Sequence, residues 1–165
     1  MALERELEVA RMAARRAGEL ALTYQRNGVS AEIKADESPV TVADREAEKL
    51  IASILSEAFP EDGLMGEEGA GRTAASGRRW IIDPIDGTRD FARGSTLWSV
   101  LIGLEAGDEV VAGVVNIPSW QQEYYATRGG GAFCNGKRIH VSEIREASQA
   151  GLFFNRLREA YAGQR

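Results

Sequence analysis

The sequence predicts an α+β fold in which two long N-terminal helices pack on a largely antiparallel β-sheet. Residues 3–24 and 41–59 each carry apolar side chains at spacings of three and four, the spacing of one buried helix face. From residue 63 the pattern changes to short β-rich runs separated by glycine-containing turns. The tight connection at residues 105–108 is typical of a hairpin, which makes the strands on either side antiparallel.

Composition and charge indicate a single globular domain. The 165 residues are 44% hydrophobic and 27% charged, and the net charge of -5 argues against nonspecific binding to nucleic acid. The first residues lack the apolar core of a signal peptide, and the longest apolar run is far shorter than the ~20 residues that span a bilayer. Cys134 and His140 are each the only residue of their type, so neither has a partner for a disulfide or a nucleophilic dyad. We therefore expect a cytoplasmic protein with no nucleic-acid or membrane partner.

The first helix is expected to present one buried stripe and to end at Asn27-Gly28. Glycine readily takes the left-handed conformation that follows a helix. Residues 29–34 alternate weakly and predict a short strand, and residues 35–39 predict a loop. The stripe consists of Leu3, Leu7, Ala10, Ala14, Ala17, Ala21 and Tyr24.

The second helix is expected to begin after Thr41 and to end at Phe59-Pro60. Thr41 with Asp44 three residues later is a near relative of the capping box. An acid in the first turn also stabilises the helix dipole, so a structural role for Asp44 stands beside any catalytic one. The apolar face of this helix consists of Ala47, Leu50, Ile51, Ile54 and Leu55.

The remaining strands follow from the β-rich runs. Residues 63–66 form a short strand that leads into Glu67-Glu68 and a polar, glycine-rich loop over residues 69–77. Residues 80–82 form a central buried strand, and strands over 97–104, 109–117, 121–126 and 132–141 extend the sheet. Trp98, Val100, Ile102 and Leu104 alternate toward one face, while the apolar residues between them indicate that the other face is partly covered.

The run WIIDPIDGT at residues 80–88 places carboxylates at the end of the central strand. Pro84 biases Asp83 toward an extended backbone, and Gly87 allows a ligand to approach the main chain. If a helical turn begins at Asp86 or Gly87, its N–H groups face the same point as the carboxylates, which suits a hard cation together with a phosphate. The alternative is an ordinary surface turn. An EF-hand loop does not fit, because Thr88 and Gly94 occupy its glycine and glutamate positions.

Four motifs in the same order give the sequence a specific resemblance. They are KAD at residues 34–36, SPVTVAD at 38–44, GEE at 66–68 and WIIDPIDGT at 80–88 with Phe91, followed by GGGAFCNGKRI at 129–139. Over roughly residues 30–142 the chain resembles the inositol monophosphatase family of magnesium-dependent, lithium-sensitive phosphatases.

The resemblance implies a role for each motif residue. Glu67, Asp83, Asp86 and the carbonyl oxygen of Ile85 are expected to bind Mg²⁺, and this all-oxygen set is also what a hard cation prefers on chemical grounds. Asp44, Glu67 and Thr88 are expected to be catalytic, orienting and deprotonating a water that attacks phosphorus directly. Lys34 is either a nearby electrostatic partner or a solvated lysine. The expected substrate-binding residues are Glu67, Ile85, Asp86, Gly87 and Thr88.

The same resemblance implies a fold and a set of partners. Residues 1–150 are expected to form the N-terminal metal- and phosphate-binding domain of a layered αβαβα sugar-phosphatase fold, and 151–165 to begin a second αβ segment. Because the family's later Trp-Asp motif is missing, we expect an N-terminal half with very low activity alone. The strands over 97–104 and 109–117 are patterned to be covered on both faces, so we also expect this chain to self-associate. The implied partners are Mg²⁺ and a small phosphorylated alcohol. A homodimer is also compatible with the resemblance. The leading substrate is inositol monophosphate and its rival is histidinol phosphate; a noncatalytic binding or regulatory module is the alternative of another class.

Overall fold

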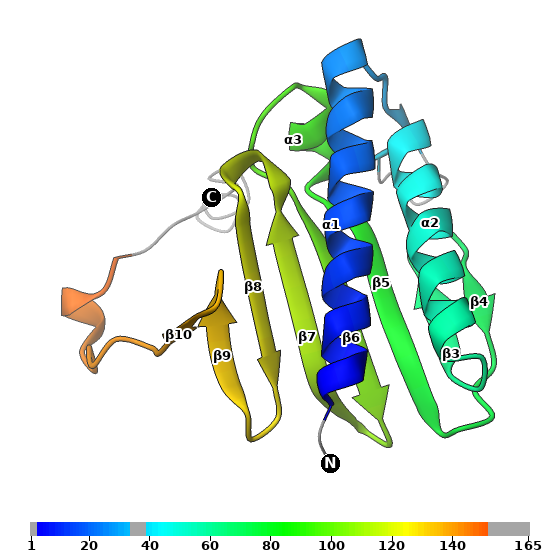
Figure 1. The fold of residues 1–165 in the computed structure, drawn as a ribbon. Coiled ribbons are helices and arrows are strands. Elements are labelled where there is room, and N and C mark those ends of the chain that lie inside the picture. Colours follow the sequence, from blue (N-terminus) through cyan, green and yellow to red (C-terminus); the bar gives the residue numbers. More distant parts are fainter. Residues whose placement is uncertain (1–2, 34–38, 152–165) are drawn as a thin grey trace, which may run out of the picture.

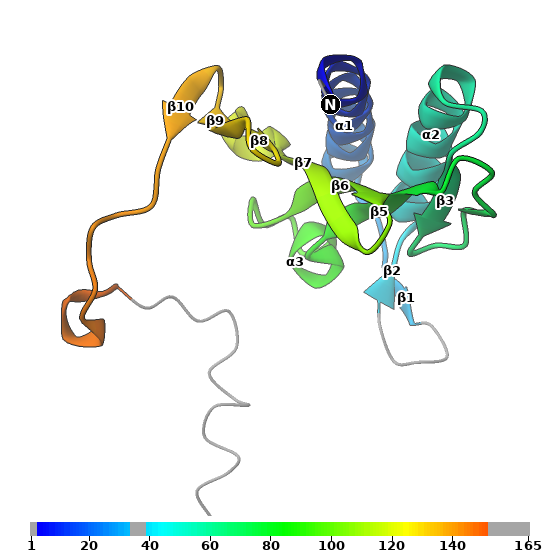
Figure 2. The same cartoon turned by 90° about the horizontal axis from the view of Figure 1, so that it is seen from below.

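The computed structural model describes residues 3–33 and 39–151, which fold as two helices on an eight-stranded sheet (Figure 1). Helix α1 (Glu4–Asn27) and helix α2 (Val42–Ala58) lie side by side on one face of the sheet (Figure 2). The short helix α3 (Thr88–Ala92) lies near the C-terminal end of α1, where Gln25 donates hydrogen bonds to the carbonyl oxygens of Phe91 and Ser95. The α+β class is confirmed.

The sheet is antiparallel with one exception that matters for the site. Its order is β10-β9-β8-β7-β6-β5-β3-β4, and of these neighbours β3 and β5 run parallel. The strands are β3 (Gly63–Gly66), β4 (Gly71–Arg72), β5 (Arg78–Asp86), β6 (Ser99–Ala106), β7 (Glu109–Ile117), β8 (Gln122–Thr127), β9 (Gly131–Cys134) and β10 (Lys137–Ile139). A separate hairpin pairs β1 (Glu32–Ile33) with β2 (Pro39–Val40). Two 3₁₀ turns complete the described elements: η1 (Pro118–Trp120) lies between β7 and β8, and η2 (Ala147–Gln149) lies after β10.

Helix α1 packs closely on the sheet because its buried face is built from small residues. Alanines at positions 10, 13, 14, 17 and 21 are buried, and a Cβ at Gly18 would lie 2.5 Å from Pro118. Asn116 donates its amide to the carbonyl oxygen of Ala14 at 3.1 Å. Arg11 and Arg15 both form ion pairs with the buried carboxylate of Glu123. These contacts join the first helix to strands that come late in the sequence.

The core lies between the helix pair and the sheet. Val100, Ile102 and Leu104 are buried on this face, as the alternation predicts, and their β5 neighbours Trp80 and Ile82 are buried with them. From the helices, Ala47, Ile51 and Leu55 complete the same core. In the part of the chain that the structure describes, no helix is both long enough and apolar enough to cross a bilayer.

Several sequence boundaries need correction. The strand expected over 29–34 is described only at β1, whose partner β2 begins inside the expected loop, and β4 lies inside the expected glycine-rich loop. The run expected over 132–141 contains the tight Asn135-Gly136 connection that its sequence indicates, which joins β9 to β10, and β10 ends at Ile139 rather than at Val141. The strand expected over 97–104 is β6, which begins only at Ser99, and Leu97 before it is 56% exposed. The central strand is longer than predicted, since β5 continues through Asp86 with a register shift between Asp83 and Asp86.

Candidate active site

The parallel pair β3 and β5 brings the two acidic motifs together. Gly66 at the end of β3 lies opposite Ile82 in β5, and the N–H of Glu67 donates to the carbonyl oxygen of Ile82 at 3.2 Å. Parallel strands end at the same edge of a sheet, so Glu67 leaves β3 where Asp83 follows Ile82. The GEE and DPID motifs therefore meet because of the direction of these strands.

The carboxyl group of Asp83 at this edge has a strongly raised pKa. Burial, the charge of Glu67, a side-chain hydrogen bond with Glu67 and the charge of Asp86 raise the pKa of Asp83 to about 8, against a lowering hydrogen bond from the N–H of Ile85. Oδ1 of Asp83 is buried and has no hydrogen-bond partner. Two carboxylates this close repel each other as anions, so the pair needs a shared proton or a cation.

Asp44 and Thr88 form the second part of the site. The hydroxyl of Thr88 lies 3.0 Å from Oδ1 of Asp44 and 3.1 Å from the carbonyl oxygen of Ile85, so its proton is shared between two acceptors. Oδ2 of the buried Asp44 accepts hydrogen bonds from the N–H of Thr41 at 2.8 Å and from its hydroxyl at 2.5 Å. The predicted capping box is therefore present, and Asp44 uses one oxygen for the cap and the other for Thr88.

The backbone turns sharply at Gly87, directly before Thr88. Gly87 has φ +95° and is the N-cap of α3, which begins at Thr88, one or two residues later than the helical turn considered from the sequence. A Cβ at Gly87 would lie 2.9 Å from the carbonyl oxygen of Leu97. Only glycine satisfies both the positive φ and this close approach. The preceding Ile85 is buried and Asp86 is exposed.

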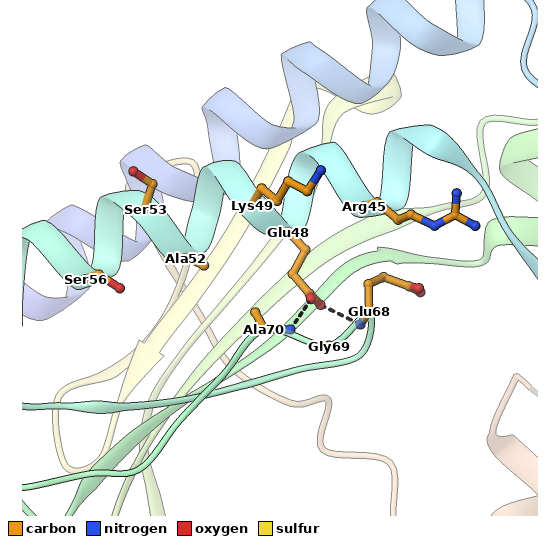
Figure 3. A pocket seen from close by; sticks show the side chains of 9 residues that line it. All are labelled: Arg45, Glu48, Lys49, Ala52, Ser53, Ser56, Glu68, Gly69 and Ala70. Carbon is orange, nitrogen blue, oxygen red and sulfur yellow. Dashed lines mark hydrogen bonds between the residues drawn. The ribbon is translucent and has the colours of Figure 1, made fainter.

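One buried acid that contacts the loop after β3 was not predicted from the sequence. The carboxylate of Glu48, 3% exposed, accepts the N–H groups of Glu68 and Ala70, both at 2.7 Å (Figure 3). Glu48 follows Asp44 by one helical turn and stands between Ala47 and Ile51 on the buried face of α2. An acid on an apolar helix face was the signal that could have identified it.

The described side chains do not form a ready-made metal cluster. Within residues 3–33 and 39–151, no three Asp, Glu, His or Cys side chains are arranged so that they could hold a metal ion as they stand. The donors nevertheless fit a hard divalent cation, because they are all oxygens and Oδ1 of Asp83 is buried without a partner. The metal and substrate roles of Glu67, Asp83, Ile85 and Asp86 remain predictions.

Comparison with known proteins identifies the family. The profile of the inositol monophosphatase family matches residues 2–159. The chain belongs to the inositol monophosphatase family. Lys34 and residues 152–165, which were expected to begin a second αβ unit, lie outside the described residues, so the roles expected of them stay predictions.

Two curated relatives and one solved structure illustrate the similarity. A histidinol-phosphatase from Chlorobaculum parvum is 46% identical over 150 residues, which cover 90% of this chain and 58% of that protein. An inositol-1-monophosphatase from Mesorhizobium japonicum is 46% identical over 104 residues, which cover 62% of this chain and 39% of that protein. The structure of an IMPase from Thermotoga maritima matches with a TM-score of 0.79 at 36% identity, covering 84% of this chain and 54% of that one. The chain thus spans about half the length of these inositol monophosphatase family members.

Proposed function

We propose that the protein acts as a Mg²⁺-dependent phosphomonoesterase that hydrolyses inositol monophosphate or a similar small alcohol phosphate by direct attack of water. The observation that carries the proposal is the meeting of Asp44, Thr88 and the carbonyl oxygen of Ile85 on the strand end that also carries Asp83. Family membership supports a phosphatase, and the contacts of Asp44 and Thr88 support the roles proposed for them.

Thr88 and Asp44 are placed to move a proton away from an attacking water. Because the hydroxyl of Thr88 donates to Asp44, its oxygen lone pairs are left to accept a water proton. Burial raises the pKa of Asp44, although hydrogen bonds from Thr41 and Thr88 partly oppose this effect. The carboxylate is therefore a better proton acceptor than an exposed aspartate.

Glu67, Asp83, Asp86 and the carbonyl oxygen of Ile85 are the groups that would hold Mg²⁺. When bound, the ion supplies positive charge that acidifies a water molecule and offsets the charge of the phosphoryl oxygens. Asp83 must lose its proton to serve as a ligand, and with a pKa of about 8 it stays mostly protonated at neutral pH unless a cation is bound. Asp86, Gly87 and Thr88 are the residues at which we place the phosphate.

Histidinol phosphate is the second candidate substrate. Of the two curated relatives described above, the histidinol-phosphatase covers 90% of this chain and the inositol-1-monophosphatase 62%. Both substrates are phosphate monoesters of small alcohols, so the proposed chemistry at Thr88 and Asp44 is the same for each.

Phosphate release from both substrates, with Mg²⁺ and with a chelator, tests the proposal. In a version of the protein as long as its relatives, we expect Mg²⁺-dependent release that falls by orders of magnitude in Asp83→Asn and Asp86→Asn, because each change removes a charge from the proposed cation site. Glu57→Gln, an exposed change on α2, is the control and should keep the wild-type rate. Near-normal release by Asp86→Asn, or equal release in chelator, would overturn the assignment.

A further inference from the structure

We propose that Glu48 is a positioning residue whose buried carboxylate fixes the loop after β3 and so holds Glu67 beside Asp83. The inference rests on the proposed function, because it treats Glu67 as a ligand for Mg²⁺. It adds a residue from the second helix to a site that the sequence motifs place on strand ends. Two sets of contacts and the spacing of two acids on α2 support it.

The first set holds the backbone on both sides of Glu67. Oε2 of Glu48 accepts the N–H of Glu68 and Oε1 accepts the N–H of Ala70, each at 2.7 Å (Figure 3). Within the same turn, the N–H of Gly66 donates to the carbonyl oxygen of Ala70 at 2.6 Å. Hydrogen bonds to a buried carboxylate are stronger than those between neutral groups, so this turn is held firmly.

The second set concerns the residue before Glu67. A Cβ at Gly66 would lie 2.4 Å from Cδ of Glu48, which means that the carboxylate packs directly on the Gly66 backbone. Glu67 therefore lies between two residues that both contact Glu48, while its own N–H is bonded to Ile82 in β5. Its main chain has little freedom to turn the side chain away from Asp83.

The third observation is the spacing on α2. Asp44 and Glu48 are four residues apart, so they share one face of the helix and are separated by about one 5.4 Å turn. Asp44 holds Thr88 of the DPIDGT motif and Glu48 holds the GEE motif. One helix thus contacts both motifs that the parallel strands β3 and β5 bring together.

Two other roles for Glu48 make different predictions. A general contribution of negative charge predicts that Glu48→Asp, which keeps the charge, behaves like the wild type. A positioning role predicts that Glu48→Asp fails like the nearly isosteric Glu48→Gln, because the shorter side chain cannot reach both amides and the amide side chain offers only one acceptor oxygen. A role in stability alone predicts a lower melting temperature with unchanged Mg²⁺ affinity.

The test combines amide hydrogen exchange with Mg²⁺ titration by calorimetry on Glu48→Gln, Glu48→Asp and the exposed control Glu57→Gln. In both Glu48 variants we expect the amides of Glu68 and Ala70 to exchange at least about tenfold faster, while amides in β6 keep their protection. We expect Mg²⁺ affinity to fall about 10- to 100-fold, the usual effect of losing a group that orients a metal ligand. The control should match the wild type in both measurements.

Each contrary result has a distinct meaning. Wild-type protection of Glu68 and Ala70 in both variants would overturn the inference, and so would faster exchange with unchanged Mg²⁺ affinity. Wild-type protein that binds no Mg²⁺ at millimolar concentration would instead overturn the proposed metal site. In that case the exchange measurement still decides whether Glu48 holds the loop.

Discussion

The protonation of Asp83 makes the stability of the metal-free protein depend on pH. Its pKa in the folded protein, about 8, lies above the ordinary value, so the folded state keeps a proton that the unfolded chain releases from about pH 4 upward. The free energy of unfolding in chelator should therefore fall as pH rises from about 4 to about 8. Asp83→Asn should flatten this part of the profile.

Denaturant unfolding of both proteins in chelator, at about pH 5 and about pH 8.5, measures the effect. Mg²⁺ added at the higher pH should stabilise the wild type and leave Asp83→Asn nearly unchanged, because the ion binds the ionised pair. If the free energy of unfolding changes with pH equally in the wild type and in Asp83→Asn, Asp83 does not hold the shared proton.

Asp44 and Thr88 should behave as one catalytic unit. Thr88→Ala and Asp44→Asn should each lower kcat by about 10²- to 10⁴-fold, since each removes a step of the same proton path. The double variant should be little worse than either single one. Thr88→Ser keeps the hydroxyl and is the matched control.

Stability measurements on the same variants separate catalysis from capping. If Asp44 served only as a cap, Asp44→Asn would cost about 0.5–2 kcal/mol and leave kcat largely intact. Multiplicative losses of kcat in the double variant would also speak against a single proton path.

At the scale of an element, the turn between β5 and α3 should depend strictly on Gly87. Gly87→Ala adds a clash with the Leu97 carbonyl to the strain of a positive φ, so we expect a loss of roughly 2–4 kcal/mol. Gly94→Ala has a similar φ of +75° but open space around its Cβ, and should cost only about 1 kcal/mol. Urea unfolding of the two variants separates backbone strain from the clash. Equal losses of stability in both would show that the contact with the Leu97 carbonyl oxygen does not matter.

The elements differ in how far the sequence could define them. The amphipathic spacing of α2 and its Thr41 cap are local, so both ends were predictable. The extent of β5 was not, because Pro84 and the paired aspartates favour a turn locally while pairing with β6 keeps Asp83 and Asp86 in the sheet. Glu48 was missed for a related reason: its amide partners lie 20 and 22 residues away, and helical spacing does not reveal them.

At the scale of the whole molecule, one face of the sheet carries an open apolar groove of about 390 Å³. The helices α1 and α2 lie on the other face (Figure 2). By strand register, Leu101, Val115 and Tyr124 stand together on the grooved face, beside a row of small residues at positions 103, 113, 126 and 132. Burying apolar surface of this kind is favourable, so we expect the 165-residue chain to self-associate.

Light scattering across a concentration series measures this tendency. Leu101→Lys should shift the chain toward monomer, because a charge in the groove opposes its burial. Val141→Lys changes a side chain that is 94% exposed and should have no effect. A wild-type chain that remains monomeric at high concentration would show that the groove is not a site of self-association.

The order of synthesis gives the alanine face of α1 a further consequence. Asn116 bonds to the Ala14 carbonyl across 102 positions, and Glu123 to Arg11 across 112. At ~5–20 residues per second, the ribosome needs roughly 5–20 s to make the strands on which this helix packs. With 24 residues and many alanines, α1 is long enough to begin forming in that interval. Alanine methyl groups expose far less apolar surface than leucine side chains. The nascent helix therefore has little tendency to aggregate before the strands that cover it have been synthesised.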